Sequence, residues 1–144
     1  MISQEGAAPE SGRAASPAKP WLVRAVGLSA GAGLIHLMVT PEHFEQWIGY
    51  GLFFLSAAIA QLSYSLLLVW KPNRALLLAG IIGNGLILGL YLVTRTVGIP
   101  IFGPEAGEVE PVGRLDVISK MVEAALVVSL MMLLRSQPVP KGTA

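Results

Sequence analysis

The sequence predicts an all-α fold: a four-helix bundle that spans a membrane. Three observations predict it, namely an excess of apolar residues, four apolar stretches of membrane-spanning length, and helix-breaking residues between them. Hydrophobic residues make up 53% of the 144 residues and charged residues only 13%, whereas soluble domains contain about 25% charged residues. The mean hydropathy is +0.65. Because a small soluble domain cannot bury so much apolar surface, we expect lipid to be the solvent.

The four apolar stretches are the expected transmembrane helices. They run over roughly residues 21–39, 47–70, 75–94 and 115–134. Each is close to the ~20 residues that a helix needs to cross the hydrocarbon layer. Backbone polar groups in lipid must be paired within their own segment, so these stretches are expected to be helices and not single strands.

The remaining residues divide the chain into a membrane domain and two tails. Residues 21–135 form the expected four-helix domain. Residues 1–20 are small, polar and rich in Ala, Pro, Ser and Gly, which predicts a disordered cytoplasmic tail. Residues 136–144 are expected to form a second cytoplasmic tail.

The distribution of basic residues predicts that both termini face the cytoplasm, in a multi-pass protein of the plasma membrane. Cytoplasmic segments carry an excess of Lys and Arg. Seven basic residues lie on the side of the tails: Arg13, Lys19, Arg24, Lys71, Arg74, Arg135 and Lys141. The other side and its helix ends hold Arg95, Arg114 and Lys120.

The composition also excludes several classes of function. There is no cysteine, which excludes disulfides, thiolate metal sites and cysteine nucleophiles. The basic residues are scattered singly, so no nucleic-acid partner is expected. The lipid bilayer is the expected partner.

The last apolar stretch carries a polar face. Asp116, Lys120 and Glu123 are spaced four and then three residues apart, which places them on one side of a helix. Ionisable groups at membrane depth usually face the bundle interior and pair with one another, so we expect Lys120 to bridge both carboxylates. His36 is expected at a similar depth, within reach of Glu123 or Asp116. Together with Glu108 from the outer segment that precedes this stretch, these residues form a candidate site for a small polar ligand.

The first outer connection allows two interpretations. Thr40 and Pro41 suit the N-cap and first position of the second helix, which explains this motif structurally. Alternatively, His36, His43 and Glu42 form a candidate site for a divalent metal ion, because imidazole and carboxylate ligands suit zinc, copper(II) or nickel. The spacing of the three residues matches no recognised metal signature.

Two further patterns concern packing. The outer segment 97–113 is long for a helix connection and contains Ile99, Ile101 and Phe102 among prolines and glycines, which predicts an ordered cap over the outer end of the bundle. The pairs Gly27-x-x-x-Gly31 and Gly85-x-x-x-Gly89 predict close helix packing, either inside the bundle or between copies of the chain. Gln61 and Asn84 lie near the midplane and are expected to pair across helices.

Two motifs of the sequence lie on the outer side. They are HxxxxPEHF from His36 to Phe44, followed by Trp47, and GxP..GPEAGExEPVG..D from Gly98 to Asp116. These motifs resemble those of an uncharacterised family of small four-helix integral membrane proteins of bacteria and archaea. The resemblance covers roughly residues 22–134 and implies the four-helix fold and an outer site. It implies no activity, cofactor or partner.

The sequence therefore leaves three functions open. The leading hypothesis is a small integral membrane protein with an extracytoplasmic site of histidine and carboxylates that binds a divalent metal ion or a small polar ligand. The alternative is an accessory subunit of a larger membrane complex or a homo-oligomer, in which the polar cluster specifies docking. The last is a redox or quinone-handling membrane enzyme. No arrangement of nucleophile and base favours an enzyme.

Overall fold

A computed structural model describes residues 18–99 and 103–137 of the chain, and within them it contains four helices and no strand. The helices are α1 (Ala18–Gln46), α2 (Ile48–Trp70), α3 (Arg74–Thr96) and α4 (Arg114–Ser136). The last three have 23 residues each, which corresponds to about 34 Å of helix. All four are long and apolar enough to cross a membrane. The predicted all-α four-helix membrane fold is confirmed.

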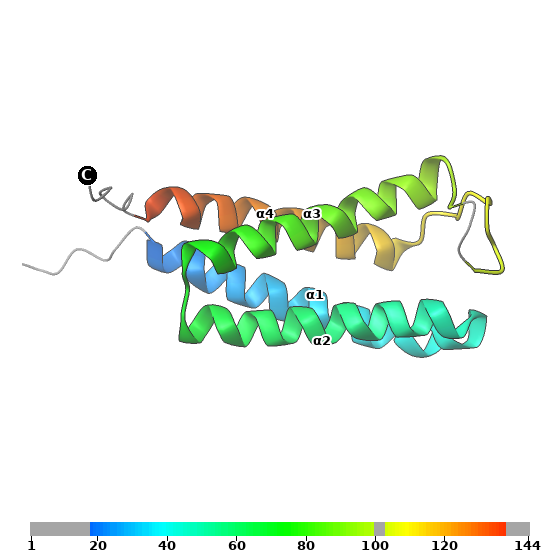
Figure 1. The fold of residues 1–144 in the computed structure, drawn as a ribbon, viewed down its shortest axis with the longest axis horizontal. Helices are drawn as coiled ribbons and strands as arrows, with labels where there is room; N and C mark the ends of the chain where they lie inside the picture. The colour runs from blue at the N-terminus through cyan, green and yellow to red at the C-terminus, as the bar shows by residue number, and fades with distance from the viewer. Residues whose placement is uncertain (1–17, 100–102, 138–144) are drawn as a thin grey trace, which may run out of the picture.

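The helices run alternately up and down, so the bundle has two distinct ends (Figure 1). The terminal end holds Ala18, the α2–α3 connection at residues 71–73, and Ser136. The loop end holds Trp47 and the α3–α4 segment 97–113. Helix α1 packs against α2 and α4, and α4 packs against α3. Helices α2 and α3 lie together at the terminal end and diverge toward the loop end (Figure 1).

The apolar core lies in the half of the bundle near the terminal end. Its buried members come from all four helices: Ala25, Leu68, Leu77, Leu126, Leu130 and Leu133. Many large apolar side chains are instead found on the outside, for example Trp70 at 80% exposure and Met38 at 73%. This arrangement is expected in lipid, where no hydrophobic driving force draws large apolar side chains inward.

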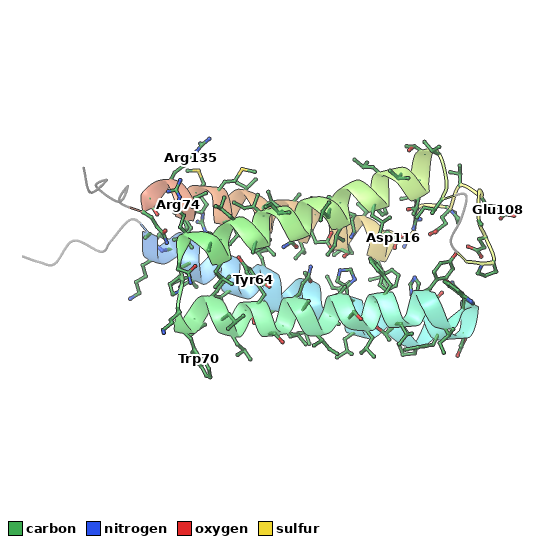
Figure 2. The ribbon with its side chains drawn as sticks, in the orientation of Figure 1. Tyr64, Trp70, Arg74, Glu108, Asp116 and Arg135 are labelled. Carbon is green, nitrogen blue, oxygen red and sulfur yellow. The ribbon has the colours of Figure 1, made fainter. Side chains whose placement is uncertain are left out.

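The basic and aromatic residues of the terminal end lie opposite the acidic residues of the loop end. Figure 2 shows Trp70, Arg74 and Arg135 at the terminal end, and Glu108 and Asp116 at the loop end. The charge asymmetry of the sequence is therefore preserved in the fold.

A polar layer lies at the middle of the bundle. The Gln61 side-chain amide donates to Asn84 Oδ1 over 3.1 Å, and the Ser29 hydroxyl donates to the Gln61 carbonyl over 2.8 Å. The Tyr64 hydroxyl donates to the Leu76 carbonyl over 3.0 Å. These bonds connect α2 to α1 and α3, so the expected pairing of Gln61 with Asn84 is confirmed.

Helix α1 is longer than the sequence predicted, because it continues through Pro41 to Gln46. The predicted break at Thr40 and Pro41, and the capping role of Thr40, are wrong. Proline removes one backbone hydrogen-bond donor from the helix, but the helix continues. The Thr40 hydroxyl donates to the His36 carbonyl within α1 over 2.7 Å, so it does not cap α2. The chain turns instead at Trp47, a single residue of extended backbone before α2.

The α3–α4 segment is fixed to the end of α3 by backbone hydrogen bonds. Gly107 N–H donates to the Ile99 carbonyl over 2.8 Å, and Glu110 N–H donates to the Thr94 carbonyl over 3.1 Å. Gly98 has a φ of 75°, a conformation that favours glycine. For the described residues, these bonds agree with the predicted ordered cap. Ile101 and Phe102, which the prediction also used, lie outside the described residues.

The two GxxxG pairs do not serve packing within this bundle. A Cβ atom added to Gly27, Gly31, Gly85 or Gly89 would meet nothing within 4 Å beyond the helix itself. Gly33 behaves differently, because its Cβ would lie 2.8 Å from Leu62 Cγ. The first interpretation, packing inside the bundle, is therefore wrong for these four glycines.

The predicted tails fall mostly outside the described residues. Residues 1–17 and 138–144 are not described, and residues 18–20 already belong to α1.

Candidate functional site

The innermost element of the candidate site is a buried pair between α1 and α4. His36 Nε2 lies 2.8 Å from Glu123 Oε1, and the two side chains are 3% and 0% exposed. The pair joins two helices deep inside the bundle, so it fixes the register of α1 against α4. The sequence analysis expected His36 within reach of Glu123 or Asp116, and Glu123 is the partner that it contacts.

The ammonium group of Lys120 completes the environment of Glu123. Lys120 Nζ donates to Glu123 Oε2 over 2.6 Å, and Ser119 Oγ lies 3.5 Å from Oε1. Both oxygens of the buried carboxylate are therefore occupied by donors. A buried charge is tolerated when it is paired and hydrogen-bonded in this way.

Asp116 does not share Lys120, contrary to the sequence-based expectation. Its Oδ2 accepts from Gly113 N–H over 3.0 Å at the start of α4, and from Arg95 Nη2 over 2.9 Å. One carboxylate thus caps α4 and holds an arginine from α3. The cap draws Asp116 toward the helix start, whereas Lys120 turns toward the buried Glu123.

Arg95 is the functional residue that the sequence analysis did not place in the site. Its guanidinium donates to Asp116 and to Glu110, and its side chain is 13% exposed. It also lies over the Tyr91 ring, with Cζ 5.0 Å from the ring centroid. Arginine at the last turn of a membrane helix usually reaches for the interface, and only the folded α3–α4 segment shows that Arg95 turns inward. The one indication in the sequence is that three glutamates, Glu105, Glu108 and Glu110, follow Arg95 closely in the chain.

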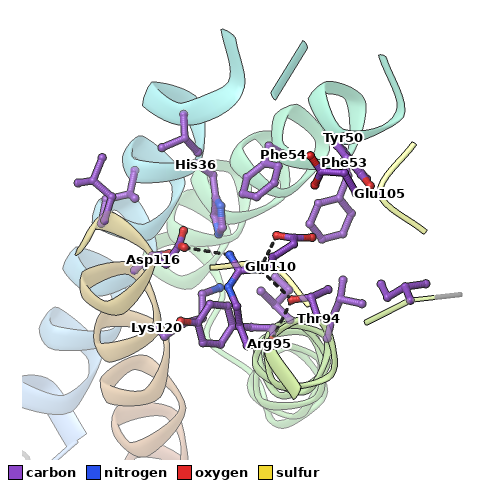
Figure 3. Close-up of a pocket in the computed structure, with 18 of the residues that line it drawn as sticks. His36, Tyr50, Phe53, Phe54, Thr94, Arg95, Glu105, Glu110, Asp116 and Lys120 are labelled. Carbon is purple, nitrogen blue, oxygen red and sulfur yellow. Dashed lines mark hydrogen bonds and ion pairs between the residues drawn. The ribbon is translucent and has the colours of Figure 1, made fainter. Parts of the chain in front are cut away.

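These groups surround a cavity of about 390 Å³ at the loop end, between the diverging helices. One wall is charged and comes from α3 and α4, with Arg95, Asp116 and Lys120 (Figure 3). The facing wall is aromatic and comes from α2, with Phe53 and Phe54 (Figure 3). A mainly apolar cavity of this size with a few converging polar groups is typical of small-molecule sites.

The rim of the cavity is acidic. Glu105, Glu108 and Glu110 of the α3–α4 segment line it, so Glu108 lines the same cavity as His36, Asp116 and Lys120. With Asp116, four carboxylates line the cavity beside two cations, Arg95 and Lys120. The lining therefore has a formal net charge of −2.

Two buried polar atoms of the cavity lining have no hydrogen-bond partner among the described residues: His36 Nδ1 and Arg95 Nε. Buried polar groups are nearly always hydrogen-bonded. Since Nε2 of His36 already faces Glu123, Nδ1 is the free atom of an imidazole that lines the cavity.

The three residues expected to bind a metal ion are not brought together. His43 Nδ1 donates to the Val39 carbonyl over 2.7 Å, and its ring lies against Phe54 with centroids 3.7 Å apart. Glu42 is exposed on α1. In the part of the chain that the structure describes, no group of three or more His, Asp or Glu side chains is arranged to hold a metal ion.

Comparisons of this chain with protein families, with curated proteins and with solved structures found no match.

Proposed function

We propose that this chain is a multi-pass membrane protein that binds a small, lipid-soluble molecule in the loop-end cavity. The observation that carries the proposal is the cavity itself, about 390 Å³ in volume, which is lined by charged residues of α3 and α4 on one side and by Phe53 and Phe54 on the other. The buried pair of His36 and Glu123 orients the imidazole. The double ion pair of Arg95 orients the guanidinium.

The arrangement of the helices supports access from the bilayer. Helices α2 and α3 bound the cavity but diverge where it lies (Figure 1). Phe53 and Leu90 line it from these two helices, and both remain partly exposed. A lipid-soluble molecule can therefore reach the charged wall from the side, without crossing the acidic rim. By the distribution of Lys and Arg, the loop end is on the extracytoplasmic side of the plasma membrane.

The test uses two neighbouring residues of α3. Ile87 lines the cavity, whereas Leu86 is outside that lining and 70% exposed. Ile87→Trp fills the cavity, and Leu86→Trp adds the same side chain on the outer face. Organic extracts of the purified wild type and both variants are compared by mass spectrometry. A compound present at about one per chain in the wild type and Leu86→Trp, and missing from Ile87→Trp, supports the proposal. Identical extracts from all three proteins contradict it.

Metal analysis of the same preparations separates this proposal from the metal site expected from the sequence. Stoichiometric zinc, copper or nickel that is lost in His43→Ala would favour the metal site instead, because His43 does not line the cavity.

A second candidate function, as a subunit of an oligomer or of a larger complex, is favoured by the outward-facing glycines. Gly27 and Gly31 on α1 have open space beside them, and Gly27 lies in a groove between α1 and α4 that Trp21 and Val128 also line. Small residues permit a second helix to approach closely. Native mass spectrometry of the wild type and of Gly27→Ile tests this. A complex that dissociates in the variant supports it, and a monomeric wild type contradicts the homo-oligomer.

A further inference from the structure

An open, mainly apolar groove lies on the outside of the bundle between α1 and α4, near the terminal end. Its lining includes the small residues Gly27 and Ala125, with Val23 and Val128 beside them. A Cβ added to Gly27 would meet nothing within 4 Å, so the small residues leave space between the two helices. The residues of this groove are separate from those that line the loop-end cavity.

One arginine lines the groove, and a second lies beyond it toward the terminal end. Arg24 belongs to the lining, and its guanidinium carbon lies 4.8 Å from the centroid of the Trp21 ring. Arg135 follows Val128 by seven residues, which places it on the same side of α4 and about 10 Å nearer the terminal end. Figure 2 shows Arg135 at that end. Both arginines are exposed.

No carboxylate of the described residues lies near these two arginines along the helices. The described carboxylates are confined to residues 42–45 and 105–123, which belong to the loop end and the middle of the bundle. Within the described part of the chain, the ion pairs use His36, Arg95 and Lys120 as their cations. Arg24 and Arg135 therefore leave positive charge uncompensated beside an apolar groove.

We propose that this groove binds one anionic phospholipid. An acyl chain lies along the small residues of the groove, and the phosphate of the headgroup lies beside Arg24 and Arg135. Basic residues near the membrane surface attract anionic lipids, and basic pockets between membrane helices bind their headgroups. Trp21 suits the same depth, because tryptophan favours the membrane–water interface. The site is separate from the loop-end cavity, so the proposal does not depend on what that cavity binds.

The charge distribution disfavours two other occupants of the groove. Copies of the chain related by a twofold axis present the same surface to each other. The Arg24 side chains of two copies would then approach one another, and like charges brought together at an interface are unfavourable. A zwitterionic phospholipid carries an ammonium group beside its phosphate, so it gains less from the two arginines than an anionic phospholipid does.

The experiment compares two lipids with identical acyl chains on the full chain purified in detergent. Native mass spectrometry measures the bound fraction of palmitoyl-oleoyl phosphatidylglycerol and of palmitoyl-oleoyl phosphatidylcholine, offered in equal amounts. We expect one phosphatidylglycerol to be retained in preference. Arg24→Gln should weaken its binding about fivefold, as estimated for the loss of one basic residue near a lipid surface. Arg74→Gln removes the same charge at the same end, outside the groove, and should bind phosphatidylglycerol like the wild type.

A second pair of variants tests the groove itself. Gly27→Ile fills it, whereas Gly85→Ile adds the same side chain at an open position of α3 outside the groove. Retention of phosphatidylglycerol should be lost in Gly27→Ile and kept in Gly85→Ile. If Gly27→Ile does not fold, the comparison of Arg24→Gln with Arg74→Gln decides the proposal.

Several outcomes would overturn the proposal. Equal retention of the two lipids by the wild type would remove the role of the arginines. Equal losses in Arg24→Gln and Arg74→Gln would show a general attraction to the basic end instead of a site. Undiminished lipid binding by folded Gly27→Ile would place the lipid elsewhere. A lipid-free dimer that Gly27→Ile separates would make a second copy the occupant of the groove.

Discussion

His36 Nε2 on α1 lies 2.8 Å from Glu123 Oε1 on α4, although the two residues are 87 positions apart in the chain. Glu123 is fully buried and also accepts from Lys120. The pair therefore connects the two helices that pack most centrally, and it places the imidazole at the inner end of the cavity. A buried carboxylate held by two donors is expected to matter for stability, for helix register and for the site.

Glu123→Ala should destabilise the protein strongly. It leaves Lys120 and His36 without their shared acceptor, and breaking a buried ion pair costs about 3–5 kcal/mol. Thermal unfolding in detergent, followed by tryptophan fluorescence, measures the effect. Glu45→Ala removes the same charge from an exposed position of α1 and should leave the midpoint unchanged. Equal midpoints for the two variants would show that the buried pair contributes nothing.

Arg95→Lys should loosen the α3–α4 segment while keeping the charge. The guanidinium of Arg95 bonds to Glu110 and Asp116 at once, and a lysine ammonium lacks the planar fork for both contacts. We expect backbone amides of residues 105–110 to exchange hydrogen about three to ten times faster, because one charged hydrogen bond is lost. Hydrogen exchange with mass spectrometry measures this. Arg114→Lys, at an exposed position, is the control, and equally fast exchange in both variants would count against the role of Arg95.

Gly80→Ala should lower stability, whereas Gly83→Ala on the same helix should not. A Cβ at Gly80 would lie 2.0 Å from the Tyr64 hydroxyl oxygen, while at Gly83 it would meet nothing within 4 Å. Tyr64 would have to move and give up its hydrogen bond to Leu76. Overpacking of this kind costs about 1–3 kcal/mol. Thermal midpoints of the two variants check the prediction, which fails if Gly80→Ala is as stable as the wild type.

Single cysteines should report which end of the bundle faces out of the cell. The chain contains no cysteine, so each introduced thiol is unique. Ala106→Cys lies at the loop end and Lys71→Cys at the terminal end, both at exposed positions. We expect a membrane-impermeant maleimide to label Ala106→Cys on intact cells and Lys71→Cys only after lysis. The reverse pattern would place the termini outside and invert the proposed orientation.

The sequence by itself determined the class of fold and the chemical character of one helix face. Four apolar stretches allow only helices in lipid, because every backbone group must be paired locally. The spacing of Asp116, Lys120 and Glu123 placed polar groups on one side of α4 through helical geometry alone. His36 was within reach of this face by depth, which left Glu123 and Asp116 as its two possible partners.

The tertiary structure decided the features that depend on contacts between distant segments of the chain. Helix α1 continues through Pro41, and the chain turns only at Trp47. The inward position of Arg95 depends on where the α3–α4 segment brings Glu110, and no spacing within one helix encodes that contact. The cavity exists because α2 and α3 diverge (Figure 1). Such features arise from packing between distant segments, whereas a sequence pattern reports only which side of each helix is polar.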